Sequence, residues 1–152
     1  MIERSHLKPQ EQQEILQKIG GELLTAVSDE WETITYTACA LIGQMSERLE
    51  ETRAGGEPER RRIPLGVIDL VRELRAGMYQ ENKGTWFTLT YTITRPGKFK
   101  ADYDYDGQPR FVFYPQSSDF ALDLRHFPRD PEYIPDWLNE KLREEAGGTA
   151  AG

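Results

Sequence analysis

Two runs of alternating side chains, one on each side of a Pro-Gly pair, constrain the fold of this chain more than any other feature. Successive side chains of a strand point to opposite faces of a sheet, so an alternating run predicts a strand with one buried and one exposed face. Both runs, Thr85–Thr94 and Phe99–Asp106, have this pattern. Pro96-Gly97 between them predicts a turn, and the two strands should therefore form an antiparallel hairpin. In the first run, the apolar residues that should share the buried face are Phe87, Leu89, Tyr91 and Ile93.

The second strand of this hairpin carries a row of acidic residues. Asp102, Asp104 and Asp106 share one parity, so we expect their carboxylates on the exposed side of the strand. The pattern Asp-x-Asp-x-Asp-Gly matches the first half of a calcium-binding loop. Position 12 of such a loop would be Phe113 instead of glutamate, which excludes an EF-hand. A looser divalent-metal site stays open beside the interpretation as a solvated or partner-facing acidic strand face.

The remaining patterns place the hairpin in an α+β protein. Apolar residues recur at helical spacing from Pro9 to about Val27 and again from Ile63 to about Gln80. Strand-forming residues fill Trp31–Ile42, and we expect Arg110–Tyr114 to form another strand of the same sheet. The sequence therefore predicts a single antiparallel sheet of about four to six strands, with helices packed on one face.

The charged stretch Gln44–Arg62 leaves two interpretations open. Gly55-Gly56 between two polar runs can form the tip of a hairpin, or the whole stretch can be a mobile loop. We favour a hairpin that extends the sheet.

The C-terminal part predicts two helices. Ser117 or Ser118 can cap a short helix over 119–126, and Pro135 begins a last helix that should dock on the sheet. We expect Trp137 in this helix to be a structural anchor with its indole packed in the core. Residues 1–146 are predicted to form a single domain, and residues 147–152 a disordered tail.

Composition narrows the functional classes. The net charge of −7 disfavours nucleic-acid binding, which starts from a basic surface. No apolar run approaches the length of a membrane span, and the first residues do not form a signal peptide. The single cysteine, Cys39, lies in an apolar stretch and is interpreted as a small buried residue in a reducing compartment. We therefore expect a cytoplasmic protein.

The motifs do not predict a catalytic or cofactor site. Asp119, Asp123 and His126 follow one helix face at i, i+4 and i+7, but a metal site needs about three or four ligands with support around them. Helix-end polar residues are the simpler interpretation. Cys39 lacks a partner for nucleophilic catalysis, and no nucleophile elbow or nucleotide-binding glycine loop occurs. We expect no enzyme activity, no cofactor and no bound metal.

A set of motifs resembles a known family. The motifs are Met78-Tyr79, Gly84-Thr85-Trp86-Phe87, Arg95-Pro96-Gly97, the Tyr-Asp-Tyr-Asp of 103–106, 124–130 (LRHFPRD) and 134–138 (IPDWL). Over about residues 65–142 the chain resembles the actinobacterial branch of the YezG-like immunity protein family. This resemblance implies a small acidic α+β protein that neutralises a polymorphic secreted toxin and has no enzymatic activity of its own.

These observations lead to one functional hypothesis and two alternatives. The hypothesis is an immunity protein, or antitoxin, that binds a cognate toxin domain encoded by a neighbouring gene and occludes its active site with an acidic surface. The candidate partner-binding residues are Asp102, Asp104, Asp106, Asp119 and Asp123.

The first alternative is a small-molecule or peptide binding module that uses the aromatic sheet face. That face would carry Trp86, Tyr91, Tyr103 and Tyr105. The second alternative, an enzyme, requires a pocket that gathers Asp119, Asp123 and His126.

Overall fold

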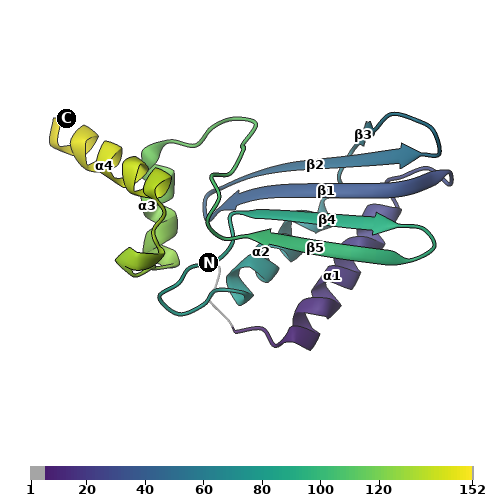
Figure 1. Cartoon of the computed structure of the whole chain (residues 1–152), viewed down its shortest axis with the longest axis horizontal. Coiled ribbons are helices and arrows are strands. Elements are labelled where there is room, and N and C mark those ends of the chain that lie inside the picture. Colours follow the sequence, from purple (N-terminus) through teal and green to yellow (C-terminus); the bar gives the residue numbers. More distant parts are fainter. Residues whose placement is uncertain (1–5, 152) are drawn as a thin grey trace.

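The computed structural model describes residues 6–151, with side chains through 147, and confirms an α+β fold. Its five strands form an antiparallel sheet in the order β3-β2-β1-β4-β5 (Figure 1). The elements are α1 (Pro9–Leu24), β1 (Trp31–Leu41), β2 (Gln44–Arg53), β3 (Glu59–Arg61), α2 (Gly66–Gly77), β4 (Thr88–Thr94), β5 (Lys98–Asp104), α3 (Ser117–His126), the 3-10 helix η1 (Pro131–Tyr133) and α4 (Asp136–Ala151).

Both predicted hairpins are present. β4 pairs with β5 through the turn at Pro96-Gly97, with Thr90 opposite Asp102. The charged stretch 44–62 forms the hairpin β2–β3 and extends the sheet, as favoured over a mobile loop. Gly55 at its tip has a φ of +70°, a conformation that suits glycine.

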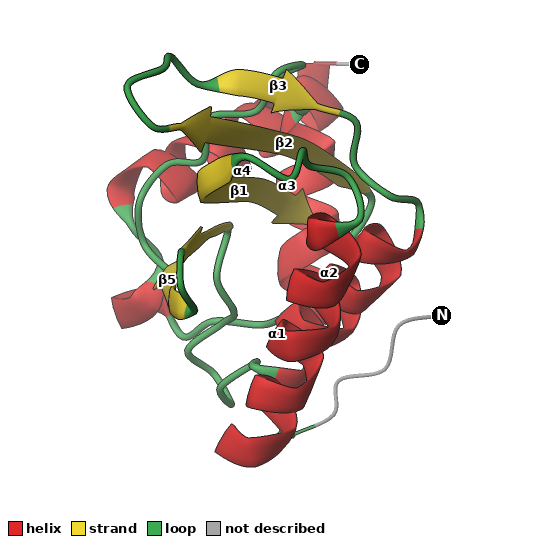
Figure 2. Ribbon diagram, turned by 90° about the vertical axis from the view of Figure 1, so that its right-hand side faces the viewer, coloured by secondary structure: helices red, strands yellow, loops and turns green. Residues whose placement is uncertain are grey.

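Helices α1 and α2 lie side by side on one face of the sheet (Figures 1 and 2). The apolar side chains of β4 point toward these helices. Leu89 and Tyr91 are buried there, which confirms the alternation predicted from the sequence. Gly20 of α1 lets the helix approach closely, because a Cβ atom at this position would lie 3.1 Å from the Tyr91 hydroxyl oxygen. That hydroxyl donates a hydrogen bond to the Leu16 carbonyl oxygen at 3.1 Å.

Helices α3 and α4 pack together beyond one end of the sheet rather than on its face (Figure 1). Trp137 of α4 is only partly buried, with its ring 5.3 Å from Phe87 and 5.8 Å from Phe120 between ring centres. Its indole N–H donates to the Asp106 carbonyl oxygen at 2.7 Å, so the indole lies at the margin of the core. The buried residues here form a second core, separate from the one between the sheet and helices α1 and α2. It consists of Cys39, Leu41, Phe87, Phe111, Phe120 and Leu138.

The predicted strand Arg110–Tyr114 is wrong, because this segment is a loop. Its apolar residues do not alternate with polar ones, and only Phe111 points into the core. The loop is held against β2 by side chains instead of a strand ladder: Gln44 Nε2 donates to the Phe113 carbonyl oxygen at 2.6 Å, and the Val112 amide donates to Ser46 Oγ at 3.2 Å.

Two boundaries near the C-terminus also differ from expectation. α3 begins at Ser117 with Gln116 as its N-cap, so neither Ser117 nor Ser118 is the capping residue. α4 runs to Ala151, so the structure continues the helix through most of the segment expected to be a disordered tail.

Candidate protein-binding surface

The sheet face opposite α1 and α2 is uncovered along most of its length (Figure 1). Its threonine side chains are partly exposed, and charged side chains border them on both sides. We call this surface the open face; it consists of Thr33, Thr35, Thr37 and Cys39 of β1, Ser46, Arg48, Glu50 and Thr52 of β2, Arg60 of β3, Thr88, Thr90, Thr92 and Thr94 of β4, and Lys98, Lys100, Asp102 and Asp104 of β5.

Strand register arranges the open face in rows. Thr37 pairs with Arg48 on one side and with Thr90 on the other, and Thr90 pairs with Asp102. Threonine suits a partly exposed strand because its β-branched side chain packs on the pleated surface while its hydroxyl reaches solvent. The centre of the open face is therefore uncharged and polar, with charges only on the outer strands.

The open face is of mixed charge, which differs from the acidic surface expected from the sequence. Asp102 lies beside Lys100, whose Nζ is 3.7 Å from Asp102 Oδ2. Arg48 and Arg60 occupy the opposite border. The overall charge of −7 is thus carried mainly by other parts of the protein.

The three aspartates of the hairpin do not form one row. Asp102 and Asp104 lie on the open face and are exposed. Asp104 Oδ1 accepts hydrogen bonds from the amides of Asp106 (3.2 Å) and Gly107 (2.9 Å) at the end of β5. Asp106 lies past the strand, and its Oδ1 accepts from Arg129 Nη1 at 3.2 Å. Only the first two of these carboxylates belong to the open face.

The two candidate aspartates of α3 are committed to the fold. Asp119 Oδ2 accepts from the Gln116 amide at 2.9 Å and closes the start of the helix. Asp123 is buried, 2% exposed, so its assignment to a partner surface is corrected. The same burial removes it from an acid–base set with Asp119 and His126.

Asp123 instead forms a buried ion pair with Arg75 of α2. The guanidinium donates to both carboxylate oxygens at 2.7 and 2.9 Å, and the Ile42 amide donates to Oδ1 at 2.7 Å. Arg75 Nε also donates to the Trp86 carbonyl oxygen at 2.7 Å. This geometry joins α2, α3 and the segment before β4. In the sequence, Arg75 follows Val71 by four positions and so lies on or near the apolar face of the helix, where a charged side chain needs a buried partner.

Arg129 makes a second set of buried contacts beside this pair. Its Nη2 donates to the carbonyl oxygens of Thr85 (3.0 Å) and Tyr105 (2.6 Å), and its guanidinium lies 4.9 Å from the centre of the Phe87 ring. A Cβ atom on Gly84, whose φ is +95°, would collide with the Arg129 side chain at 2.2 Å. The glycine therefore makes room for the arginine.

Residues 62–132 of the chain match the family model described as immunity protein YezG-like. This match confirms, over residues 62–132, the resemblance found in the sequence. No curated protein matches the chain. The YezG-like segment spans α2, β4, β5 and α3, including the Arg75–Asp123 pair and Arg129, whereas β1, β2 and β3 lie outside it. The family supports an immunity role.

The YezG-like segment also contains an exposed apolar loop, residues 107–116, beside the open face. Val112 is 68% exposed and Phe113 is 82% exposed. Tyr114 packs partly against the protein, since the centre of its ring lies 5.9 Å from that of the Phe120 ring. Exposed large apolar side chains in one place are typical of protein-contact surfaces. The strand predicted for this segment gave no indication that these apolar side chains are exposed.

Most of the aromatic face is covered by the helices. Trp86 and Tyr91 are 0% and 3% exposed beneath the helices, and Tyr103 and Tyr105 are partly buried. Burial raises the pKa of the Tyr103 hydroxyl to about 12. Tyr103 lines a cavity between α1 and β5 that Trp86, Tyr91 and Tyr105 do not line, so the four rings do not form one ligand site.

Within residues 6–151, no group of three or more His, Cys, Asp and Glu side chains is placed to hold a metal ion. In the same described part, every helix is too short or too polar to cross a membrane.

Proposed function

We propose that this protein is a non-catalytic immunity protein that binds and neutralises a cognate toxin domain through its open face and the adjoining loop 107–116. The YezG-like match supports the immunity role. The observation that carries the choice of surface is the uncovered threonine face bordered by the exposed Phe113. The toxin domain is the product of a neighbouring gene, and the complex forms in the cytoplasm.

This surface has the parts of a standard protein interface. Such interfaces bury about 800 Å² on each partner and combine apolar anchors with a polar surround. Phe113 and Val112 supply apolar anchors, and the open face supplies the polar surround. The opposite face of the sheet cannot serve, because α1 and α2 cover it. Binding at the open face would neutralise the toxin by covering its active site.

Asp102 and Asp104 have a defined place in this proposal. They form the carboxylate border of the open face on β5 and would meet basic groups of the toxin domain. Toxins that act on nucleic acids or nucleotides commonly have a positively charged active site, to which carboxylates are complementary. Exposed charges of this kind act mainly on the rate of association.

The first test is co-expression of the protein with the product of its neighbouring gene. The two should co-elute on size exclusion, and the protein should abolish the growth inhibition caused by the toxin. Absence of both co-elution and protection for each adjacent gene product would contradict the proposed function.

The second test uses the double variant Asp102→Asn/Asp104→Asn. Its association rate with the toxin domain should fall roughly tenfold at low salt, and high salt should slow the wild type. The matched control is Glu73→Gln, an exposed carboxylate of α2 on the covered side of the sheet. Equal association rates for wild type, double variant and control would remove the aspartates from the interface and leave the immunity role intact.

A further inference from the structure

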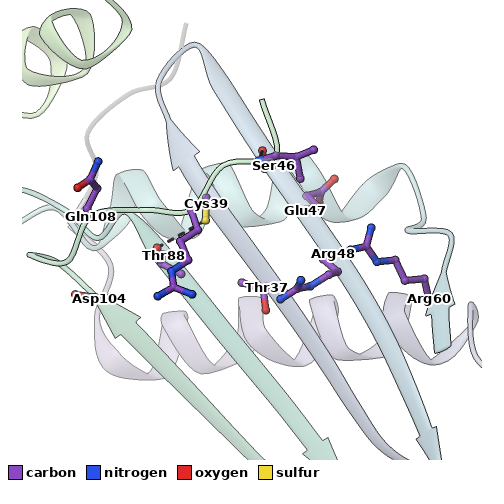
Figure 3. A pocket seen from close by; sticks show the side chains of 11 residues that line it. Thr37, Cys39, Ser46, Glu47, Arg48, Arg60, Thr88, Asp104 and Gln108 are labelled. Atoms are coloured by element: carbon purple, nitrogen blue, oxygen red, sulfur yellow. Dashed lines mark hydrogen bonds between the residues drawn. The ribbon is translucent and has the colours of Figure 1, made fainter. Parts of the chain in front are cut away.

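A cavity of about 340 Å³ opens onto the open face next to loop 107–116 (Figure 3). Three arginines line it, each from a different element: Arg48 of β2, Arg60 of β3 and Arg110 of the loop. Hydroxyl groups add further hydrogen-bond donors to its wall, from Thr37, Ser46 and Thr88. The three arginines outnumber the two carboxylates of the lining, on a protein whose net charge is −7.

Among the residues whose side chains are described, two of these guanidinium groups lack an acceptor. Arg48 Nε lies 3.4 Å from Glu50 Oε1, a partly exposed ion pair. The side chains of Arg60 and Arg110 form neither an ion pair nor a hydrogen bond with any residue in the described part of the chain. A guanidinium has five N–H donors, and those of Arg60 and Arg110 are left to solvent or to a bound group.

Two carboxylates, Glu47 and Asp104, also line the cavity, and both already accept hydrogen bonds from other groups of the protein. Asp104 Oδ1 accepts two amide hydrogen bonds at the end of β5. Glu47 accepts a hydrogen bond from the buried Tyr36 hydroxyl at 2.7 Å. Neither carboxylate forms an ion pair with Arg60 or Arg110 among the described residues, so the N–H donors of these two guanidinium groups stay available to a bound group.

We infer that this cavity binds carboxylate side chains of an acidic segment on the toxin domain. The inference rests on the proposed function and specifies the partner's chemistry. Guanidinium groups bind carboxylates through two parallel hydrogen bonds, which gives both strength and direction. The exposed Phe113 beside the cavity favours a protein partner over a free anion. The lining contains no glycine-rich phosphate-binding loop.

The row that contains Arg48 also gives the complex an orientation. Arg48 and Asp102 stand at opposite ends of this row, with Thr37 and Thr90 between them. Three strand spacings separate the two charges by roughly 14 Å. A toxin surface with an acidic group over the arginines and a basic group over Asp102 fits only one way round. The reversed orientation places like charges together, which selects against it.

A hexaglutamate peptide provides a probe that does not require the toxin. We would titrate it into the ¹⁵N-labelled full chain and follow backbone amide and arginine Nε–H signals. The peptide should shift the signals of Thr37, Arg60, Thr88 and Arg110 in a saturable way. In Arg60→Gln/Arg110→Gln its apparent affinity should fall roughly tenfold, as expected for the loss of two charge-assisted contacts.

Arg125→Gln is the matched control, since Arg125 is an exposed arginine of α3 that does not line the cavity. It should bind the peptide as the wild type does. Shifts that are absent at the cavity, or that are equal in the double variant and the wild type, would overturn the inference. Inorganic phosphate is titrated in parallel, and tighter binding of phosphate at the same signals would also overturn it. None of these outcomes depends on whether a toxin co-elutes.

Discussion

The two faces of the sheet are made by the same strands and have opposite roles. On β4, Leu89 is fully buried beneath the helices, whereas the next residue, Thr90, is partly exposed on the open face. The covered face fixes the fold, because its side chains pack against α1 and α2. Apart from Cys39 and Ser46, which contact the second core and loop 107–116, the open face has no packing partner within the described chain, so its side chains are available to a binding partner.

The same contrast holds for two neighbouring acidic residues of β2. Glu50 lies on the open face, and its contact is an ion pair with Arg48 at 3.4 Å. Glu51 points to the other side and is 0% exposed, yet its carboxylate accepts hydrogen bonds from the Ser28 amide (2.9 Å) and hydroxyl and from Arg61 (2.8 Å) and Arg53 (3.2 Å). Burial alone would raise the pKa of this carboxyl, but the hydrogen bonds lower it to about 2.

The largest difference in the free energy of unfolding should be between the variants Leu89→Ala and Thr90→Ala. Leu89→Ala removes buried side-chain volume and should lower the free energy of unfolding by about 2–5 kcal/mol. Thr90→Ala changes a partly exposed position and should lower it by less than about 1 kcal/mol. Urea unfolding followed by circular dichroism measures both. Equal losses for the two variants would mean that both faces are packed, and the comparison would fail.

A smaller difference in stability, which depends on pH, should be found between the variants Glu51→Gln and Glu50→Gln. At pH 7, Glu51→Gln should lower the free energy of unfolding by about 1–3 kcal/mol, because hydrogen bonds to a buried charge are lost. Glu50→Gln should change it by less than about 0.5 kcal/mol, the usual contribution of an exposed pair.

The sign of the pH dependence follows from the lowered pKa of Glu51. Its contribution is complete above the unfolded value of 4.5 and disappears as pH falls through the folded value of about 2. The stability gap between wild type and Glu51→Gln should therefore be constant from pH 7 to about 5 and then narrow. Unfolding curves at a series of pH values measure it, and a gap that widens in acid would contradict the hydrogen-bond assignment.

The sequence predicted the covered face better than the open one, for a physical reason. Burial imposes a period of two on each strand, so Leu89 and Tyr91 could be recognised from spacing alone. Long-range partners leave no such local trace. The bidentate contact of Asp123 with Arg75 joins residues 48 positions apart, and Asp123 was consequently expected at the surface. Strand-forming residue types suggested a strand at Arg110–Tyr114, but pairing depends on a neighbouring strand edge, and β2 binds this loop through its side chains.

The variant Phe113→Ala should have the smallest effect on stability but a large effect on binding. The Phe113 side chain is 82% exposed, so Phe113→Ala should change the free energy of unfolding by less than about 0.5 kcal/mol. If the open face and its loop hold the toxin domain, an exposed aromatic at their border becomes a buried anchor, and truncation should weaken binding by roughly 30-fold or more, equivalent to at least about 2 kcal/mol. Leu65→Ala is the control, because Leu65 is similarly exposed, 92%, but precedes α2 on the covered side. Calorimetric titration with the toxin domain compares the two. Equal affinities for both variants would move the interface away from loop 107–116, whereas a loss for Leu65→Ala alone would assign it to the helical side and reverse the roles of the two faces.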